Sequence, residues 1–446
     1  MNDHESASTF DEVEHILSSV ASAGIRPGLE RAQRLLRRLG HPQDRWPALH
    51  VVGTNGKGST CAFLASCLQA CGYRTALYTS PHLESPEERL LIDGEPLSAG
   101  AWLDAAQRVT SAVGEDALLA ADPPSYFELV TAAAFLLASE GGAEVAVVEA
   151  GLGGRLDATN LLGDVLCSVI ASISMDHMDF LGDTIEAIAG EKFAVARRGV
   201  PACLMGDDAS LVPLFRSFCE RVGALPFVVS EEADVSDARV DEEGCTFDFR
   251  APGLELPGIR TRMIGRYQLS NAALALSSLS CVMEALPRLS PAGILRGMED
   301  ARWPGRMELL SRSPLVALDG AHNLDGMRKL TQSVRELWPD RDLAVVYATM
   351  RDKDYMGCLS SLSALRPVLY ATTVPGMDRS LPVDELLSAS RGYPWNGVPH
   401  AFGSPLDAAR VAISEHGAVL ICGSLYLIGW IRPRLREMLE ADDALR

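Results

Sequence analysis

ALHVVGTNGKGST, residues 48–60, is the stretch that decides the fold of this chain. Its first five residues are mostly apolar, as in a short buried strand, and a glycine-rich loop follows at residues 53–60. A loop of this kind between a strand and a helix exposes backbone N–H groups at the positive end of the helix, where they can surround phosphates. Lys57 adds a positive charge at the same place. ATP or GTP is therefore the first expected ligand.

The loop differs from the common P-loop at both ends. Val51 stands where the first glycine would fall. Gly58 separates Lys57 from the hydroxyl groups of Ser59 and Thr60. Glycines between a strand and a helix can also serve only as turn residues, because glycine is the default wherever φ is positive. The strand, loop and helix context favours the phosphate-binding interpretation.

The length and composition predict a globular protein of more than one domain. A chain of 446 residues is too long for one core, and 47% hydrophobic with 22% charged residues is typical of globular proteins. The net charge of −19 argues against nucleic acid or an anionic membrane as the main partner, because phosphate binding needs clustered Lys and Arg. It does not exclude small anionic substrates, because a pocket can be locally positive.

Further features of the sequence predict a cytoplasmic protein. The N-terminus lacks the basic and apolar stretches of a secretory signal, and the longest apolar run, Ala418 to Ile431, is too short to span a bilayer. Ten cysteines occur without a CxxC pair, which is typical of reduced thiols in a core. We expect small-molecule partners, no nucleic acid, no membrane and a monomer.

Apolar strand-like runs alternate with longer amphipathic stretches, which predicts an α/β fold with a mainly parallel sheet and helices on both faces. In the first part of the chain the expected strands are Ala48–Val52, Thr75–Tyr78, Glu144–Glu149, Val165–Ala171 and Ala202–Met205. The expected helices are Lys57–Ala70, Phe127–Ser139 and Thr184–Ala196. Residues 226–257 are interpreted as a small antiparallel excursion.

A second α/β pattern begins near Ser313. Its expected strands are Leu315–Leu318, Leu343–Tyr347, Pro367–Ala371 and Ala418–Cys422. Pro304 and Gly305 stop the preceding helical stretch, so we place a domain boundary near residue 300. The predicted architecture is a P-loop-containing N-terminal domain with a mainly parallel sheet, residues 1–300, and a smaller Rossmann-like α/β C-terminal domain, residues 301–446.

A second chemical feature is VAVVEAGLGGRLDATN, residues 145–160, in which a hydrophobic strand ends in Glu149 before a glycine turn. A carboxylate at the end of a strand next to the P-loop strand is where nucleotide enzymes hold Mg²⁺, so Glu149 is the expected metal ligand. Polar clusters also follow strands at residues 79–83, 174–182 and 318–326. Active sites of open parallel sheets lie at the carboxyl ends of strands, so these clusters are expected to converge on one cleft.

Several motifs, taken in order, resemble those of one known family. They are GTNGKGST at 53–60, SPHL at 80–83, EAGLGGRLDATN at 149–160, DH at 176–177 with LG at 181–182, EK at 191–192, PGR at 304–306, DGAHN at 319–323 and DKD at 352–354. The set is similar to the folylpolyglutamate synthase/dihydrofolate synthase family of the Mur-ligase superfamily, which contains ATP-dependent amide-forming ligases. The match extends from about Gly28 to Ser424.

This resemblance implies roles for individual residues and for the two domains. The nucleotide would be bound by Gly56, Lys57, Gly58, Ser59, Asn271, Arg306 and Asp319. Two Mg²⁺ ions are implied, with Ser80, Glu149, His177 and a carbamylated Lys192 as their ligands. The N-terminal domain would bind ATP and folate, and the C-terminal domain would be the glutamate-ligase domain.

The pterin substrate is expected at two segments of the N-terminal domain, which the resemblance points to. They are Arg26, Pro27, Gly28 and Leu29, and Ser125, Tyr126, Phe127 and Glu128. The aromatic pair could stack on a flat ring, although core packing at a helix start explains it about equally well.

The implied reaction converts the substrate carboxylate into an acyl phosphate with the γ-phosphate of ATP, and the amino group of L-glutamate then displaces phosphate. Mg²⁺ and Lys57, the expected catalytic cation, would offset the charge on the phosphoryl group. His322 or Asp319 is the candidate proton acceptor. The resemblance therefore implies a role in folate biosynthesis and one-carbon metabolism. The sequence leaves open whether the enzyme adds the first glutamate to dihydropteroate, extends a folate or does both.

Two positions depart from the family pattern. Phe193, Ala194 and Val195 follow Lys192 where Ala-Gly-Ile is usual, which bears on the surroundings of the expected carbamate. Leu324 stands after DGAHN where proline is usual, and this is interpreted as a variation at a helix start.

Two other classes of protein remain open from the sequence. One is a Mur-type ligase acting on a cell-wall nucleotide peptide, and the other is a nucleotide-binding regulatory protein without catalysis. The GKGS spacing and the SPHL motif favour the folate branch. The joint presence of Glu149, His177, Lys192 and Asp319 argues against a protein that has lost catalysis, because a binding module needs only the phosphate loop.

Overall fold

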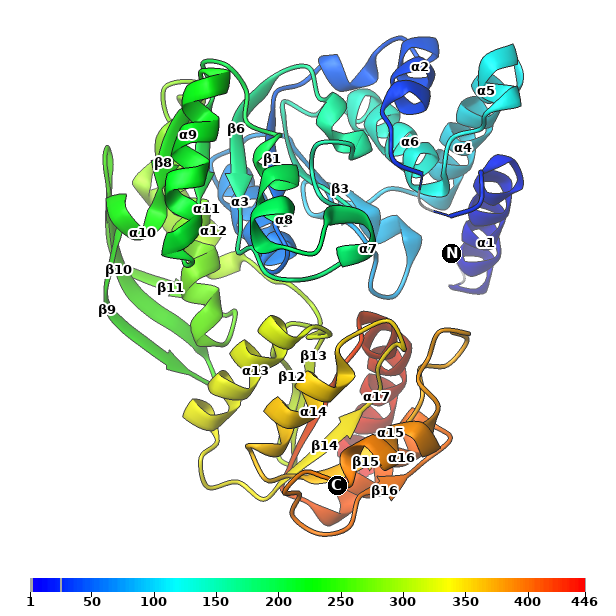
Figure 1. Cartoon of the computed structure of the whole chain (residues 1–446), viewed down its shortest axis with the longest axis vertical. Helices are drawn as coiled ribbons and strands as arrows, with labels where there is room; N and C mark the ends of the chain where they lie inside the picture. Colours follow the sequence, from blue (N-terminus) through cyan, green and yellow to red (C-terminus); the bar gives the residue numbers. More distant parts are fainter. Residues whose placement is uncertain (1–2, 25, 446) are drawn as a thin grey trace. The chain divides into compact units, whose positions relative to one another are not determined.

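Parallel strands form the centre of both parts of the protein. The computed structural model describes the backbone of residues 3–24 and 26–445 and the side chains of residues 10–24 and 26–441 (Figure 1). The chain divides into two compact units, and each is described by itself. The first unit comprises Met1–Ala238, Phe247–Arg260 and Ser270–Ala301, and the second comprises Arg239–Thr246, Thr261–Leu269 and Arg302–Arg446.

The first unit contains an eight-stranded sheet in the order β4-β3-β2-β5-β1-β6-β7-β8. Its strands are β1 (Ala48–Val52), β2 (Thr75–Tyr78), β3 (Leu90–Ile92), β4 (Glu95–Pro96), β5 (Val145–Glu149), β6 (Val165–Ile170), β7 (Pro201–Leu204) and β8 (Leu225–Val228). The strands from β2 to β8 in this order run parallel, whereas β3 and β4 are antiparallel additions at one edge. The predicted α/β fold with a mainly parallel sheet is confirmed.

The register of the central strands brings their carboxyl ends to one edge of the sheet. Val51 pairs with Glu149 of β5 on one side and with Val169 of β6 on the other. Tyr78, the last residue of β2, pairs with Val148. The segments that follow β1, β2, β5 and β6 therefore leave the sheet side by side, which positions the polar residues they carry.

Helices pack against this sheet in two hydrophobic clusters. One cluster joins α1, α2, α4 and α6 to strand side chains, and the other joins α8 and α9 to them. The helices of residues 1–301 are α1 (Asp3–Val20), α2 (Glu30–Arg38), α3 (Lys57–Ala70), α4 (Ala99–Gly114), α5 (Ala117–Ala121), α6 (Tyr126–Glu140), α7 (Met178–Leu181), α8 (Ile185–Phe193), α9 (Val212–Val222), α10 (Val229–Glu232), α11 (Arg266–Val282) and α12 (Pro291–Asp300), with the 3-10 turns η1 (Pro42–Asp44), η2 (Pro86–Arg89), η3 (Ala158–Leu161) and η4 (Ala209–Leu211).

Three consecutive strands, β9 (Asp234–Asp241), β10 (Gly244–Ala251) and β11 (Leu254–Thr261), form a separate sheet in the order β11-β10-β9. Two-residue connections join them, and only antiparallel neighbours can be joined by so few residues. The antiparallel excursion expected at residues 226–257 is therefore present, shifted to residues 234–261.

The second unit contains a six-stranded sheet in the order β12-β13-β17-β14-β15-β16. Its strands are β12 (Glu308–Arg312), β13 (Leu315–Asp319), β14 (Leu343–Tyr347), β15 (Val368–Ala371), β16 (His400–Ala401) and β17 (Ala418–Cys422). Its helices are α13 (Leu324–Leu337), α14 (Tyr355–Ser363), α15 (Val383–Ser390), α16 (Pro405–Glu415) and α17 (Leu425–Leu445). Only the β12–β13 pairing is antiparallel among the pairs of this sheet, so the second predicted α/β pattern is also present.

The apolar run from Ala418 to Ile431 is divided between strand β17 and the start of helix α17. Gly423 and Ser424 separate the two elements, as expected from the sequence. Among the described residues, no helix has both the length and the apolar character that a membrane crossing would need.

Helices α3 and α12 approach each other closely at Gly297. The Ser66 hydroxyl donates a hydrogen bond to the Gly297 carbonyl oxygen at 2.7 Å, and an added Cβ atom would collide with the Cα atom of Cys67. We predict that Gly297→Ala lowers the free energy of unfolding by about 1–3 kcal/mol, because the two backbones must separate. Unfolding in denaturant measures the effect.

Gly190→Ala in helix α8 is the matched control for this substitution. A methyl group added at Gly190 meets no atom within 4 Å, and the residue has ordinary helical geometry. Alanine should therefore be neutral or stabilising there by up to about 1 kcal/mol. Equal destabilisation by both substitutions would contradict the prediction.

Candidate active site

The glycine loop after β1 turns sharply at Gly56, and helix α3 begins at the next residue, Lys57. Gly56 has a φ of +86°, and a Cβ atom added there would collide with Asn271 Oδ1. A residue with a side chain would therefore be both strained and obstructed at this position. The structure thus brings together the loop and Asn271 of α11, two of the predicted nucleotide-binding features.

The segment that follows β6 supports the loop from the side. The Thr54 hydroxyl donates to the Ser174 carbonyl oxygen at 3.0 Å and accepts from the Ser174 amide at 3.1 Å. The Ser172 hydroxyl donates to the Asn55 carbonyl oxygen at 3.2 Å. These bonds join the ends of two neighbouring strands, so the loop is held by the protein itself before any ligand binds.

A buried ion pair lies at the same edge of the sheet. Lys57 Nζ is 3.8 Å from Glu149 Oε1, and the two side chains are only 17% and 6% exposed. Lys57 Nζ also donates to the Thr54 carbonyl oxygen at 3.3 Å. The amine therefore sits at the start of α3, between the glycine loop and the carboxylate that ends β5.

Ser80 and Glu149 follow neighbouring parallel strands and offer oxygen atoms of the kind that Mg²⁺ prefers. The Ser80 hydroxyl is enclosed and has no hydrogen-bond partner among the residues that the structure describes. Among the described residues, no cluster of three or more His, Cys, Asp and Glu side chains is arranged to hold a metal ion. Because Mg²⁺ usually keeps several waters and phosphate oxygens, this pair fits a magnesium ion that binds together with a nucleotide.

Lys192 lies in helix α8 and is 2% exposed. Its Nζ donates to the Gly53 carbonyl oxygen at 2.9 Å, so the amine lies directly against the start of the glycine loop. Burial, and then the nearby Lys57 charge, lower the pKa of Lys192 to about 7. A large part of this amine is therefore unprotonated at neutral pH, which is the form that reacts with carbon dioxide to give a carbamate.

His177 differs from the other predicted metal ligands in its exposure. It is exposed at the start of α7, has a φ of +51°, and its amide donates to Asp176 Oδ1 at 2.9 Å. The Asp176 charge acts on Lys192, so the α7 segment lies in the electrostatic range of the buried amine. Glu149 and Lys192, by contrast, are buried.

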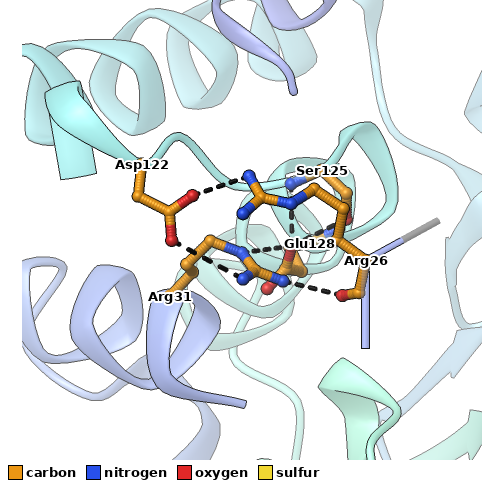
Figure 2. A network of polar contacts seen from close by, with 5 residues as sticks. All are labelled: Arg26, Arg31, Asp122, Ser125 and Glu128. Atoms are coloured by element: carbon orange, nitrogen blue, oxygen red, sulfur yellow. Dashed lines mark hydrogen bonds and ion pairs between the residues drawn. The ribbon is translucent and has the colours of Figure 1, made fainter. Parts of the chain in front are cut away.

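A polar network joins the two segments predicted to bind the pterin (Figure 2). Arg31 Nη2 donates to the Arg26 carbonyl oxygen at 2.7 Å, and Arg31 Nε donates to Glu128 Oε2 at 3.4 Å. Asp122 pairs with Arg26 at 2.6 Å and with Arg31 at 3.7 Å. Glu128 Oε2 also accepts from the amide and the hydroxyl of Ser125, each at 2.7 Å. The structure therefore links Arg26 of the first segment to Glu128 and Ser125 of the second through Arg31.

The two aromatic residues at the start of α6 point to different neighbours. Phe127 packs so closely on Gly151 that an added Cβ atom there would collide with its ring. The Tyr126 hydroxyl donates to Glu14 Oε1 at 3.4 Å, and the Arg89 guanidinium lies 5.9 Å from the centre of the Tyr126 ring. Both rings are only partly buried.

A buried chain of hydrogen bonds that the sequence did not reveal supports the glycine turn after β5. His50 Nε2 donates to Thr159 Oγ1 at 2.8 Å, and Thr159 Oγ1 donates to Asp157 Oδ1 at 2.5 Å. Asp157 Oδ2 accepts from the Leu152 amide at 2.8 Å. Burial raises the pKa of the Asp157 carboxyl. Asp157 lies inside the recognised motif, but its link to His50 in β1 depends on the tertiary fold.

The second unit contains its own group of predicted site residues, around Asp319 at the end of β13. Asp319 is 3% exposed; its Oδ2 accepts from the Met307 amide at 2.9 Å and from the Tyr267 hydroxyl at 3.0 Å. Its Oδ1 accepts from the Ala321 amide at 2.8 Å. Burial raises the pKa of Asp319, and the Arg306 charge opposes that effect. The Asp319 carboxylate therefore stabilises the backbone at Met307 and at Ala321.

Arg306 and His322 lie next to this carboxylate. The Arg306 guanidinium packs over Gly320, where an added Cβ atom would collide with its Nη1. His322 Nδ1 lies 2.9 Å from the Gly320 carbonyl oxygen and must carry a proton to donate to it. In a neutral imidazole this leaves Nε2 as the basic nitrogen. The structure therefore groups Arg306, Asp319 and His322 around one glycine.

A second carboxylate fixes the turn that carries Arg306. Glu308 Oε2 accepts from the Gly305 amide at 2.9 Å and from Arg432 Nε of helix α17 at 2.7 Å. Hydrogen bonds from Arg432 and Gly305 hold the pKa of Glu308 below its usual value, against the effect of burial. Met307, between the two anchoring points, has a φ of +45°, a strained value for a residue with a side chain.

The two departures from the family pattern have structural explanations. Phe193 is fully buried, and its ring packs against those of Phe215 and Phe218 at 5.3 and 6.3 Å. The Phe193 side chain therefore fills a hydrophobic core, and Lys192 keeps its hydrogen bond to the Gly53 carbonyl oxygen. Leu324 is the first residue of α13, and the Asn323 side chain caps that helix by accepting from the Gly326 amide.

Comparisons with known protein families identify both units. Residues 98–279 match the Mur ligase middle domain, and residues 305–425 match the glutamate ligase domain of Mur ligases. The glycine loop precedes the first of these ranges. The order of the two matched domains follows the order of the two sheets along the chain.

Relatives with similar sequences share most of the chain. A dihydrofolate synthase/folylpolyglutamate synthase of Bacillus subtilis is 35% identical, covering 93% of this chain and 96% of the relative. The protein of the same name from Escherichia coli is 31% identical, with 96% and 94% covered. Among solved structures, Mycobacterium tuberculosis folylpolyglutamate synthase complexed with ADP has a TM-score of 0.89 at 30% identity, with 96% and 98% covered. E. coli FolC in complex with DHPP and ADP has a TM-score of 0.85 at 30% identity, with 98% and 99% covered.

The buried His50 generates a prediction about acid sensitivity. Burial, and then the Arg197 charge, lower the pKa of His50 from 6.5 to about 3, so the native ring stays neutral where the unfolded chain takes up a proton. As the pH falls from 6.5 towards 3, His50 therefore reduces the free energy of unfolding by up to about 1.4 kcal/mol per pH unit. His50→Gln, which keeps a side-chain N–H donor, lacks this contribution.

Unfolding in urea at several pH values between 7 and 4.5 tests the prediction. The stability of the wild-type protein relative to the glutamine variant should decrease steadily as the pH is lowered. A stability difference that is the same at every pH would contradict it.

Proposed function

Because the chain belongs to the dihydrofolate synthase/folylpolyglutamate synthase family of Mur-type ligases, we propose that it joins L-glutamate to dihydropteroate, to reduced folates or to both, at the expense of ATP. The observation that carries this proposal is the Lys57–Glu149 pair beside the unpartnered Ser80 hydroxyl at the carboxyl edge of the first sheet. A phosphate loop, a cation and two oxygen ligands are what phosphoryl transfer from a nucleotide requires. The choice of glutamate and a pterin or folate as the other substrates follows from the names of the related enzymes.

In this proposal the ATP phosphates lie on the backbone amides of residues 56–59. Lys57 is positioned to contact them, because its amine is already directed at the loop by the Thr54 carbonyl. Asn271 contacts the nucleotide from α11, since it lies directly on Gly56. Arg306 and Asp319 are nucleotide contacts carried over from the family pattern, with Asp319 acting mainly through the backbone that it holds.

Magnesium would be held by Ser80 and Glu149 in this site, with phosphate oxygens and waters completing its coordination. When bound, it supplies positive charge that stabilises the phosphoryl group during transfer. His177 would serve a second ion. A carbamylated Lys192 would also contribute to metal binding. Its lowered pKa leaves an amine that can react with carbon dioxide, and the carbamate formed would place carboxylate oxygens beside the glycine loop.

The chemistry assigned to this chain has two steps. The substrate carboxylate attacks the γ-phosphorus of ATP to form an acyl phosphate and release ADP. The amine of L-glutamate then attacks the acyl carbon, the amide bond forms, and phosphate leaves. Lys57 would offset negative charge in the first step. The attacking amine must lose a proton in the second step, and His322 Nε2 suits that role better than Asp319, whose oxygens already accept several hydrogen bonds.

The folate-side substrate is assigned to the segments joined by the network of Figure 2. Glu128 Oε1 is enclosed and has no hydrogen-bond partner within the described part of the chain, and it would accept from donors of the pterin ring, which carries an amino group and a ring N–H. Tyr126 and Phe127, the first two residues of the same helix, offer aromatic rings on which the pterin could stack. We further propose that residues 1–300 and 301–446 act as the ATP- and folate-binding domain and the glutamate-ligase domain of a monomeric, cytoplasmic enzyme.

ADP release is the measurement that tests the proposed reaction. The purified protein is incubated with Mg-ATP and L-glutamate, and either dihydropteroate or tetrahydrofolate is added. Turnover with both substrates would identify a bifunctional enzyme, and turnover with one would identify which activity the chain has. Absence of ADP release with both, from folded protein that binds ATP, would overturn the proposal and favour a cell-wall substrate or a regulatory role.

Replacing Glu149 tests the magnesium site. We predict that Glu149→Gln lowers kcat roughly 100-fold or more and raises the magnesium concentration needed for half-maximal rate, because a charged oxygen ligand is lost next to the phosphates. Glu144→Gln is the control: Glu144 is exposed just before the same strand and pairs with Arg288. A magnesium requirement that is unchanged in Glu149→Gln would remove this residue from the site.

Replacing Arg306 tests the nucleotide contact in the second unit. Arg306→Ala should raise the KM for ATP by about 10- to 100-fold, as expected for the loss of charge-assisted hydrogen bonds to phosphate, with little effect on unfolding. Arg312→Ala is the comparison, because Arg312 is exposed and pairs with Glu242 and Glu243, away from the Asp319 group. If both variants retain the wild-type KM, Arg306 has no part in binding ATP.

A further inference from the structure

Only the serine of the SPHL motif, residues 80–83, has a role in the proposed function. The Ser80 hydroxyl is assigned to magnesium, yet it has no hydrogen bond to any described residue that would fix its direction. The backbone on either side of Ser80 must therefore set where this oxygen points. In metal sites, neighbouring groups that do not touch the metal commonly orient its ligands, and their loss weakens metal binding.

The connection between the antiparallel strands β2 and β3 contains Ser80 and folds back onto its own start. Its last two residues, Glu88 and Arg89, end the turn η2. The Arg89 carbonyl oxygen accepts from the Thr79 amide at 3.0 Å. The Arg89 side chain donates from Nε to His82 Nδ1 at 3.1 Å. Arg89 therefore contacts the residue before Ser80 and the second residue after it.

Glu88 holds the next part of the same connection. Both of its carboxylate oxygens accept from backbone amides, Oε2 from Leu83 at 2.7 Å and Oε1 from Glu84 and Ser85 at 2.9 and 3.0 Å. Hydrogen bonds from backbone N–H groups to an ionised carboxylate are stronger than bonds between neutral groups. Together with the contacts of the neighbouring arginine, these bonds fix the loop on both sides of Ser80.

The Arg89 side chain is suited to be a rigid support, because its own surroundings restrict it. It is 8% exposed, and its guanidinium carbon lies 5.9 Å from the centre of the Tyr126 ring. A cation placed over an aromatic face recovers part of the free energy that it lost on leaving water. Burial limits the rotamers open to this side chain, so its hydrogen bond to His82 keeps a defined geometry.

We infer that Glu88 and Arg89 are positioning residues for magnesium: they hold the SPHL loop so that the Ser80 hydroxyl is directed at the ion that binds with the nucleotide. The inference rests on the proposed function, because it takes Ser80 as a magnesium ligand. Neither residue touches the ion or the nucleotide in this role. Without these supports the loop samples other conformations, so magnesium binding must also order the loop, which lowers the affinity for the ion.

Nucleotide binding with and without magnesium tests the inference in the absence of turnover. Dissociation constants of AMPPCP, an ATP analogue that cannot transfer its γ-phosphoryl group, are determined by calorimetry in excess MgCl₂ and in EDTA. The ratio of the two constants measures how much magnesium strengthens binding. The variants are Arg89→Met, Arg89→Lys, Glu88→Ala, Ser80→Ala and the double variant with Ser80→Ala and Arg89→Met. Urea unfolding confirms that each protein is folded.

Two substitutions on the first unit are the matched controls. Arg288→Met removes an arginine that also lies over a tyrosine ring, Tyr73, at 3.9 Å, but pairs with Glu144. Glu87→Ala removes the carboxylate next to Glu88 in the same turn, which accepts from the Ser85 hydroxyl at 2.8 Å.

Arg89→Met and Glu88→Ala should each reduce the effect of magnesium about 10-fold and leave binding in EDTA unchanged, as expected when a group that orients a metal ligand is lost. Arg89→Lys keeps a donor and should retain part of the effect. In the Ser80→Ala background, Arg89→Met should cause no further loss, because the hydroxyl that it positions is absent. Both controls should behave as the wild type. Glu88→Ala and Arg89→Lys still test the inference if Arg89→Met does not fold.

Other outcomes would overturn the inference. An equal loss of AMPPCP affinity with and without magnesium would make Glu88 and Arg89 general supports of the fold. A loss from Arg89→Met that is as large in the Ser80→Ala background as in the wild type would show that Arg89 does not act through Ser80. If magnesium has no effect on the wild type, the magnesium site of the proposed function fails as well. A loss in Ser80→Ala that neither Arg89→Met nor Glu88→Ala reproduces would overturn the positioning role alone.

Discussion

The parallel register of β2, β5, β1 and β6 is the constraint on which the rest of the first unit depends. Because these strands end together, the glycine loop, the Ser80 hydroxyl and the Glu149 carboxylate reach one edge without long connections. The alternation of side chains along a strand has a period of two, so a shift of one residue in β5 would turn Glu149 to the opposite face of the sheet. The 3.8 Å approach of Glu149 to Lys57 is therefore a consequence of strand pairing.

Buried carboxylates do different work in the two units. Glu149 faces Lys57 at the sheet edge and lies beside the Ser80 hydroxyl, which has no hydrogen-bond partner in the described residues. Asp319 and Glu308 instead accept hydrogen bonds from backbone amides on both sides of Arg306. Their negative charge is largely used in fixing a strained turn, since Met307 adopts a positive φ between them. Glu149 is therefore suited to binding a metal ion, whereas Asp319 and Glu308 position the backbone that carries Arg306.

The sequence predicted most of the fold, because strand and helix periodicity are local signals. Helix Lys57–Ala70 and strands Thr75–Tyr78 and Leu343–Tyr347 have the predicted bounds. Motif residues such as Lys57 and Glu149 were also identifiable, since each lies within a few positions of its own strand end. What the sequence could not provide were contacts between distant segments: the link from His50 to Asp157 through Thr159, and the place of Arg89 beside Tyr126. Neither has a pattern in the surrounding residues, because both depend on which strands become neighbours.

The ion pair between Glu308 and Arg432 joins the turn of Arg306 to helix α17. Arg432 lies in α17, and its guanidinium makes two hydrogen bonds of 2.7 Å to the carboxylate that holds the Gly305 amide. During synthesis on the ribosome, the turn therefore lacks this support until Arg432 of helix α17, 124 residues downstream of Glu308, has been made. The glycine loop of the first unit is made much earlier, whereas the turn of Arg306 can be fixed in this way only after Arg432 has been added to the chain.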